Sequence, residues 1–567
     1  MKEALIAAIV LVCSTGYSQG PVVLSFDPKQ GVIGSTVCIK GANFSSTPED
    51  NVVYFGASRA SVIEATKEEL LVTVPPGANY KPISVLVNGL IAHSKTPFTV
   101  KFENKGVYFA YPSVYSTFPT KPIDIALGDF DGDLKVDLAA VGFNNDILNK
   151  SGEVLVFQNI TENLDSVTFK EKSVYETGIN PHSVKIFDMD GDGGLDIIVL
   201  NSTSASISIL RNSSSGQGVI DFEAKQDFET GLFPVHFTIA DLDSDGKLDI
   251  AVSNSIDFSF SVLKNISTPG KIDFKENGNC KFLTQLGDIE AGDLDGDGFP
   301  ELIISVGLKR ALWIFKNRSM MIDSIAFDEP FELLIDGGGG WLTLGDVDYD
   351  SKLDVILSIP TLVTNLAGES FSHVFLFKNT SKIDDFSFEK YIYKTAVFAR
   401  EAAISDFDGD GGLDFAVGAS ALRDSLSIFR NKNISNQIEF SKVAAYRTGA
   451  NPLSIEAGDM NGDGRTDLVI GARGGGFMIH KNFAKPPPLG ASQFEQIRIY
   501  PNPSSSVLNI EGGAHIASLK IMNLLGQVVA KYTNNETIDV TNLSVGTYFL
   551  IIDTWQGGTK VVKFIKK

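Results

Sequence analysis

Asp188-Met189-Asp190-Gly191-Asp192-Gly193-Gly194-Leu195-Asp196 is the stretch that decides the fold, because it is one of seven copies of the pattern D-x-D-x-D-x-x-x-D. Each copy follows a short alternating segment and precedes an apolar, β-branched run, an order that predicts strand, turn and strand in every repeat. We call the copies loops one to seven and number their positions 1 to 9. They start at Asp129, Asp188, Asp241, Asp293, Asp346, Asp406 and Asp459, and successive starts are 59, 53, 52, 53, 60 and 53 residues apart.

A third and a fourth strand complete each repeat. The fourth contains phenylalanine and often ends in Thr-Gly. Four strands in each unit, seven times over, predict an all-β chain with a seven-bladed β-propeller over residues 106–484, because ring closure removes the exposed sheet edges. An open β-solenoid is the alternative, although its repeats are usually much shorter. The third strands are apolar pairs followed by a spacer and an asparagine, and they end at Asn159, Asn212, Asn265, Asn317, Asn379 and Asn431.

The composition agrees with many short strands joined by tight turns. Of 567 residues, 53 are glycine and 39 are phenylalanine, and only 21% are charged. The net charge of −21 excludes nucleic acid as a partner, since no basic stripe is present that could neutralise phosphates. This charge points instead to cations.

The repeats resemble FG-GAP or VCBS repeats, which form the blades of integrin α-subunit propellers and of many bacterial surface proteins. The resemblance rests on the seven acidic loops and covers residues 106–484. It implies an integrin α-like propeller of the kind found at cell surfaces.

The acidic loops carry the donor atoms that calcium prefers. Calcium binds six to eight hard oxygen ligands, and positions 1, 3, 5 and 9 supply carboxylates while position 7 supplies a carbonyl oxygen. We therefore expect up to seven Ca²⁺ ions, in preference to magnesium, which demands stricter geometry. The expected ligands are Asp129, Asp131, Asp133, Lys135 and Asp137; Asp188, Asp190, Asp192, Gly194 and Asp196; Asp241, Asp243, Asp245, Lys247 and Asp249; Asp293, Asp295, Asp297, Phe299 and Glu301; Asp346, Asp348, Asp350, Lys352 and Asp354; Asp406, Asp408, Asp410, Gly412 and Asp414; and Asp459, Asn461, Asp463, Arg465 and Asp467.

The loops differ in how easily the turn should form. Glycine at positions 4 and 6 permits a left-handed backbone, and loops two, four, six and seven have it at both. Loop one has Leu134 at position 6, and loop five has Tyr349 and Ser351 at positions 4 and 6. We expect loops one and five to bind metal least readily.

Charge repulsion argues for counter-ions. Six loops with four acidic residues and one with three place 27 acidic residues in seven short turns. Seven divalent ions would change the net charge from −21 to about −7. We expect these ions to stabilise the turns rather than to take part in ligand binding.

The N-terminal residues are typical of a signal peptide followed by a small β-sandwich. An apolar run from Ala4 to Cys13 and a small-x-small site ending at Ser18 predict removal of residues 1–18 on export. Residues 21–102 alternate as in a β-sandwich. With the pattern P-x-x-G-x-x-G-x-x-V-x-I-x-G-x-N-F from Pro28, they resemble the IPT/TIG immunoglobulin-like domain, a spacer or binding module in secreted proteins.

The C-terminal residues form another predicted β-sandwich. Residues 485–490, with three consecutive prolines, predict a stiff linker. Residues 491–567 then predict about seven strands and contain Tyr500-Pro501-Asn502-Pro503 and Leu525-Gly526-Gln527. They resemble the type A sorting domain read by the Bacteroidota type IX secretion system. The resemblance implies that the tail addresses the protein to this machinery, and that the protein is secreted or held at the outer surface.

The sequence contains no recognisable catalytic constellation. It has no G-x-S-x-G elbow, HExxH motif or phosphate loop, and we expect His182 and His236 to be ordinary strand residues. The sequence therefore predicts a non-enzymatic protein that binds a polysaccharide or a protein through a propeller face or the IPT/TIG module. The alternative is a secreted polysaccharide-degrading hydrolase or lyase, with a carboxylate pair as general acid and base. A purely structural matrix protein is a third possibility.

Overall fold

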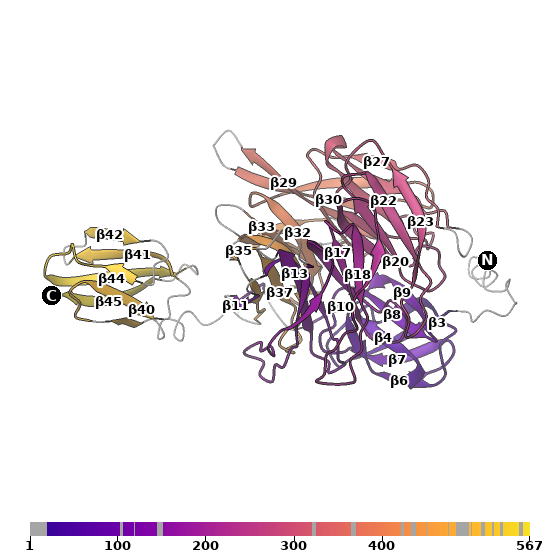
Figure 1. Ribbon diagram of the computed structural model, residues 1–567, viewed down its shortest axis with the longest axis horizontal. Coiled ribbons are helices and arrows are strands. Elements are labelled where there is room, and N and C mark those ends of the chain that lie inside the picture. Colours follow the sequence, from indigo (N-terminus) through magenta and orange to yellow (C-terminus); the bar gives the residue numbers. More distant parts are fainter. Residues whose placement is uncertain are drawn as a thin grey trace. The chain divides into compact units, whose positions relative to one another are not determined.

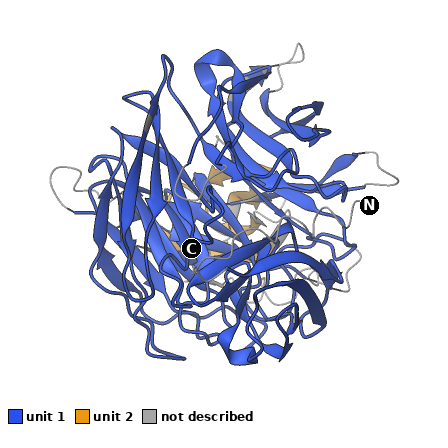
Figure 2. Ribbon diagram, turned by 90° about the vertical axis from the view of Figure 1, so that its right-hand side faces the viewer, with its two compact units in different colours: residues 1–484 blue, residues 485–567 orange. Residues whose placement is uncertain are grey.

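The computed structural model consists of two compact units, residues 1–484 and 485–567 (Figure 2). The expected signal peptide and the proline-rich linker lie outside the described residues. Within the described residues the regular elements are strands and two short 3₁₀ helices, which confirms the predicted all-β class. The structure describes residues 20–102, 106–110, 112–117, 120–143, 151–319, 325–364, 370–420, 425–432, 438–448, 451–474, 476–483, 498–500, 502–511, 516–523, 527–532, 537–554 and 559–567.

The repeat region forms seven four-stranded antiparallel sheets (Figure 1). In the first six sheets the strand order follows the chain. The strands are β12 (Lys121–Gly128), β13 (Asp137–Phe143), β14 (Glu153–Phe157) and β15 (Ser173–Glu176); β16 (Pro181–Phe187), β17 (Asp196–Asn201), β18 (Ser206–Leu210) and β19 (Gln226–Glu229); β20 (Pro234–Ala240), β21 (Asp249–Asn254), β22 (Ser259–Asn265) and β23 (Phe274–Lys281); β24 (Ile289–Gly292), β25 (Glu301–Val306), β26 (Ala311–Phe315) and β27 (Phe331–Leu334), with η2 (Gly307–Lys309); β28 (Trp341–Gly345), β29 (Asp354–Thr364), β30 (Ser370–Asn379) and β31 (Phe388–Thr395); and β32 (Ala399–Ser405), β33 (Asp414–Ala419), β34 (Ser425–Asn431) and β35 (Phe440–Arg447).

The seventh sheet closes the ring with a strand from the start of the repeat region. Its order is β11 (Ser113–Ser116), β38 (Gly476–His480), β37 (Asp467–Ala472) and β36 (Pro452–Gly458). The first strand of each sheet contacts the first strand of the next, and β36 contacts β12. The segment that we expected to begin the first unit therefore supplies the outer strand of the last one, an exchange that ties the two ends of the ring together.

Seven asparagines connect each sheet to its predecessor. In each case Nδ2 of the third-strand asparagine donates to the carbonyl oxygen at position 2 of the preceding loop. The pairs are Asn159 to Met460, Asn212 to Phe130, Asn265 to Met189, Asn317 to Leu242, Asn379 to Leu294, Asn431 to Val347 and Asn482 to Phe407. The repeating asparagine of the sequence thus provides a hydrogen bond between neighbouring sheets around the ring. The bond from Asn159 joins the first sheet to the last and spans 301 residues of the chain.

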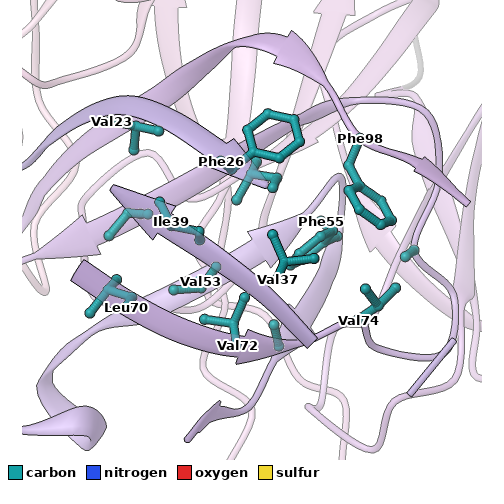
Figure 3. Close-up of a cluster of buried hydrophobic side chains, with 14 of the residues drawn as sticks. Val23, Phe26, Val37, Ile39, Val53, Phe55, Leu70, Val72, Val74 and Phe98 are labelled. Carbon is teal, nitrogen blue, oxygen red and sulfur yellow. The ribbon is translucent and has the colours of Figure 1, made fainter. Parts of the chain in front are cut away.

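The N-terminal part of the first unit is a sandwich of two four-stranded sheets, ordered β1-β3-β7-β6 and β5-β4-β8-β9, with the short parallel pair β10-β2. Val37, Ile39, Phe55 and Phe98 are fully buried between its sheets (Figure 3). The elements are β1 (Val22–Asp27), β2 (Gln30–Gly31), β3 (Thr36–Ala42), η1 (Pro48–Asp50), β4 (Val52–Phe55), β5 (Ser58–Ala60), β6 (Val62–Ala65), β7 (Glu69–Thr73), β8 (Pro82–Val87), β9 (Leu90–Pro97) and β10 (Thr99–Val100).

The second unit is also built from two sheets, ordered β39-β40-β43 and β42-β41-β44-β45. Leu508, Leu519, Leu550 and Phe564 are fully buried in its core. Its strands are β39 (Arg498–Tyr500), β40 (Val507–Glu511), β41 (Ile516–Asn523), β42 (Val528–Tyr532), β43 (Thr537–Asp539), β44 (Gly546–Thr554) and β45 (Thr559–Lys566).

Candidate metal-binding loops and central chamber

Each acidic loop joins the first strand of a sheet to the second, and its carboxylates hold the turn in shape. In loop two, Asp188 accepts hydrogen bonds from the backbone N–H groups of Gly191 and Gly193, both at 2.8 Å. Asp196 accepts from Met189 N and from Asn212 N, again at 2.8 Å. These bonds turn the backbone so tightly that the acidic side chains face one another.

The carboxylates converge as the sequence predicted. In loops one, two, three and five, oxygens from positions 1, 3 and 9 lie within 4.8 Å of one another, and in loop four the same holds for positions 1, 3 and 5. Oxygens about 2.3–2.6 Å from a common calcium ion would have this mutual spacing. The donor set and its spacing therefore fit a hard divalent cation.

Positions 4 and 6 adopt the left-handed backbone in loops without glycine as well. Leu134 in loop one has φ of 70°, and Tyr349 and Ser351 in loop five have φ of 63° and 69°. A non-glycine residue in this region costs roughly 1–2 kcal/mol. The acidic hydrogen-bond pattern thus imposes the turn even where the residue type opposes it.

Burial raises the pKa values of these carboxyl groups and so disfavours their ionised form in the absence of a cation. Burial raises the pKa of Asp188 to about 7, and it raises the pKa of Asp196 well above its ordinary value. The neighbouring loop carboxylates reinforce both shifts, whereas the backbone hydrogen bonds oppose them. A bound cation would remove this penalty because it favours the charged form.

Sequence reasoning missed a basic residue that enters five of the loops. It stands directly before the repeating asparagine, so its position in the third-strand signature could have revealed it. The five residues are Arg211, Lys264, Lys316, Lys378 and Arg430.

The N-terminal sandwich covers the ring of acidic loops. Ala57 O accepts from Asp129 N in loop one, and Ile91 N donates to Gly246 O in loop three at 2.7 Å. The Tyr54 hydroxyl donates to Gly193 O in loop two, and the Tyr80 hydroxyl accepts from Asp346 N in loop five. Lys95 lies 3.9 Å from Asp293 in loop four. We had expected a propeller face to be open to a partner. The sandwich instead covers the face that carries the acidic loops.

A chamber of about 1530 Å³ lies between this sandwich and the first strands of the seven sheets. All seven first strands contribute to its wall, together with Tyr54, Tyr80 and His93 of the sandwich. Its aromatic surface includes Trp341, whose ring lies 4.8 Å from the Arg400 guanidinium. The chamber is large enough for a ligand of several sugar units or comparable size.

Charged side chains outside the acidic loops meet in this chamber. Lys185 Nζ lies 3.2 Å from Glu290 Oε1, and Thr238 Oγ1 donates to Glu290 Oε2 at 3.1 Å. His236 Nδ1 lies 3.1 Å from Asp288 Oδ1, and the His236 and His182 rings are 5.9 Å apart. Both histidines are strand residues, as expected, and ring closure brings their neighbouring strands β16 and β20 together around one space.

Burial and mutual repulsion shift the pKa values of these groups. Burial raises the pKa of Glu401 well above its ordinary value, and Asp124, Glu456 and Asp288 add to the shift. Burial lowers the pKa of His236 to about 4, with a further contribution from Lys185. At neutral pH the chamber thus holds a neutral histidine and a set of carboxyl groups with different affinities for protons.

Three sequence families match parts of the chain. Residues 21–100 match the family described as IPT/TIG domain, residues 188–252 and 406–470 match FG-GAP-like repeats, and residues 498–567 match the secretion system C-terminal sorting domain. The resemblances inferred from the sequence are thereby confirmed. The protein belongs to the class of secreted or cell-surface repeat proteins that carry a sorting domain.

Whole-length sequences and solved structures resemble the chain only weakly. No curated protein sequence matches the chain. Among solved structures, an auxiliary nutrient binding protein from Bacteroides thetaiotaomicron is 12% identical, with 82% of this chain and 97% of that chain covered and a TM-score of 0.32. Another auxiliary nutrient binding protein, from Bacteroides ovatus, is 15% identical, with coverages of 82% and 98% and a TM-score of 0.31. Likenesses at these scores carry no argument about function.

The localisation follows from the sorting domain, which indicates a secreted or cell-surface protein and implies contact with the secretion machinery. Within the part of the chain that the structure describes, no helix has the length and apolar character needed to cross a membrane.

Proposed function

We propose that this is a secreted or cell-surface binding protein that holds a saccharide in the chamber between the IPT/TIG domain and the first strands. The chamber of about 1530 Å³ is the observation that carries the proposal. Binding sites for small ligands are concave and mostly apolar, with a few well-placed polar groups. Trp341 and the Glu290–Lys185 pair give this chamber both kinds of surface.

The proposed ligand class follows from the chemistry of the wall. Carboxylates such as Glu290 and Glu456 accept hydrogen bonds from sugar hydroxyls, and the indole of Trp341 offers an apolar face for a sugar ring. The sandwich contacts the loop face, so a folded protein partner could not lie flat against that face. A saccharide therefore fits the chamber better than a folded protein does.

We propose further that acidic loops without a third-strand basic side chain on their carboxylates bind calcium as a structural ion. The convergence of carboxylate oxygens within 4.8 Å supports this role. An ion that binds only the folded loop stabilises the fold by mass action. Calcium would thereby hold the first and second strands of each occupied sheet, and with them the wall of the chamber.

A glycan array with the mature chain tests the binding proposal. The Glu290→Gln variant should weaken binding of the selected saccharide by about tenfold, since it replaces a charged acceptor with a neutral one. Glu229→Gln is the matched control, because Glu229 is exposed on the outer strand β19. Equal affinity of both variants for every captured saccharide would contradict a site in the chamber.

The second candidate function is hydrolysis or elimination of a polysaccharide. It is favoured by the carboxyl groups outside the loops, among which Glu401 has a strongly raised pKa and Asp124 a pKa raised by burial to about 6. Carboxyl groups with separated pKa values are typical of general acid and base pairs. Turnover of a bound glycan that is lost in Glu401→Gln would identify the protein as an enzyme.

A further inference from the structure

One position of the repeat decides whether a third-strand side chain adds a positive charge to an acidic loop. It is the residue directly before the third-strand asparagine, and in six of the seven sheets its side chain contacts the loop of the same sheet. The seven residues at this position are Gln158, Arg211, Lys264, Lys316, Lys378, Arg430 and Lys481.

Lysine occupies the centre of loops three and four. The Lys316 ammonium contacts Asp295 and Asp297 at 2.5 Å and lies 3.3 Å from Glu301, so it touches positions 3, 5 and 9 of its loop. Its side chain is only 5% exposed. Lys264 contacts Asp243 and lies 2.9 Å from Asp245 in the same way, and it is equally buried. These ammonium groups stand where a calcium ion would have to coordinate.

Loops two, five and six contain the same kind of contact. Arg211 binds Asp190 through Nε at 2.7 Å and also contacts Asp192. Lys378 contacts Asp348, and Arg430 contacts Asp408 and Asp410. Five loops thus hold a side-chain cation against the acidic residue at position 3.

Loops one and seven differ from these five. In loop one the position is Gln158, whose uncharged Nε2 donates to Asp131 Oδ2 at 2.7 Å. In loop seven Lys481 turns away, and its ammonium donates to the carbonyl oxygens of Leu164 and Asp165. In both loops the position-3 side chain therefore lacks a third-strand cation among the described contacts. The basic residues that pair with these loops, Lys135 and Arg465, lie 3.6 Å and 3.2 Å from the position-5 residues Asp133 and Asp463.

A calcium ion and a buried ammonium cannot share the same carboxylate oxygens. Two positive charges a few ångströms apart repel each other strongly in a buried site. In each of loops two to six the position-3 carboxylate, one of the expected calcium ligands, is therefore already paired with a side-chain cation, which disagrees with an ion in all seven loops. We infer that in loops two to six the basic third-strand side chain takes the place of the metal ion, so that these loops fold without calcium. Loops one and seven remain as calcium sites, and this part rests on the proposed structural role of calcium. The replacement of the metal ion in loops two to six does not depend on that role.

Exchanging the residues of loops one and three tests the inference. Lys264→Gln gives loop three the residue that loop one has naturally, and Gln158→Lys makes the opposite change. Counting bound calcium per chain by equilibrium dialysis with metal analysis should give two ions for the wild type, three for Lys264→Gln and one for Gln158→Lys. Lys271→Gln, at a lysine that is 71% exposed and pairs with Asp273 outside the loop, should keep the wild-type count.

Thermal unfolding in a chelator gives a second readout, which does not require counting bound ions. Lys264→Gln should melt several degrees below the wild type in chelator and should recover when calcium is added, and Arg430→Gln provides the same test in loop six. Seven calcium ions in the wild type, with no change in Lys264→Gln, would overturn the inference and leave calcium binding intact. If the wild type binds none while Lys264→Gln binds one, the inference stands and the calcium role of loops one and seven fails.

Discussion

Removing one of the seven connecting asparagines should weaken the propeller by a predictable amount. Asn265 is 1% exposed, and its Nδ2 donates to Met189 O and Leu248 O, both at 2.9 Å. Its Oδ1 accepts from Ser267 N at 2.8 Å. Asn265→Ala loses these three bonds but keeps the backbone bond from Asn265 N to Asp249.

The magnitude follows from the number of bonds lost. A buried hydrogen bond contributes about 1 kcal/mol net, and a buried group left without a partner costs about 1–3 kcal/mol. The loss of three bonds from Asn265 should therefore lower the free energy of unfolding by about 3 kcal/mol. Asn265→Asp should cost at least as much, because a carboxylate would face the carbonyl oxygens of Met189 and Leu248.

Urea unfolding followed by tryptophan fluorescence measures the effect, since Trp313 is only 8% exposed and lies within the fourth sheet. Asn163→Ala is the control, because Asn163 is exposed and the described bond of its side chain is the one that it accepts from the backbone N–H of Asp165. It should change the free energy by about 0.5 kcal/mol or less. Equal losses in Asn265→Ala and Asn163→Ala would refute the role of the asparagine network.

Three other predictions concern strain, protons and export. Leu134→Gly should stabilise the chain by about 1 kcal/mol, because it relieves a left-handed backbone at a residue that is 39% exposed; Leu164→Gly, at a residue without positive φ, should destabilise it in the same denaturation assay. Burial raises the pKa of Asp241 to about 7 and that of Asp249 to about 8, so the folded chain without metal retains protons that the unfolded chain has released. Stability in chelator should therefore fall from pH 6.5 to pH 8, and a rising melting temperature over this interval would contradict the assignment. Deleting residues 491–567 should leave the protein in the periplasm of a host with type IX secretion, whereas normal appearance in the medium would show that the tail is not the address.

The sequence predicted the local features of the repeats well, because they depend on residues close together in the chain. The loop at Asp188 shows why, since the hydrogen bonds that Asp188 and Asp196 accept within the turn come from backbone groups three to seven positions away. The ranking of the loops by their glycines was less informative. Leu134 and Tyr349 adopt the left-handed backbone that glycine would favour, and the loop around Leu134 is one of the two that a third-strand cation leaves available.

The chain's order alone did not show which distant residues share a space. Asp124, Lys185, Glu290, Glu401 and Glu456 stand on five different first strands, and they meet only because the ring brings those strands around one axis. The sequence pattern likewise does not show that the IPT/TIG domain covers the acidic loops, because this cover depends on contacts between the separately packed sandwich and propeller.

The sequence by itself determined the all-β class, the number and chemistry of the acidic loops, and the families at both ends of the chain. These features follow from periodicity and from short-range hydrogen bonds, which a single repeat already contains. The tertiary structure alone decided that β11 closes the ring, that basic side chains enter five loops and that a charged chamber lies beneath the sandwich. The physical reason is that these contacts join groups separated by tens to hundreds of residues, and only packing of complete sheets brings such groups together.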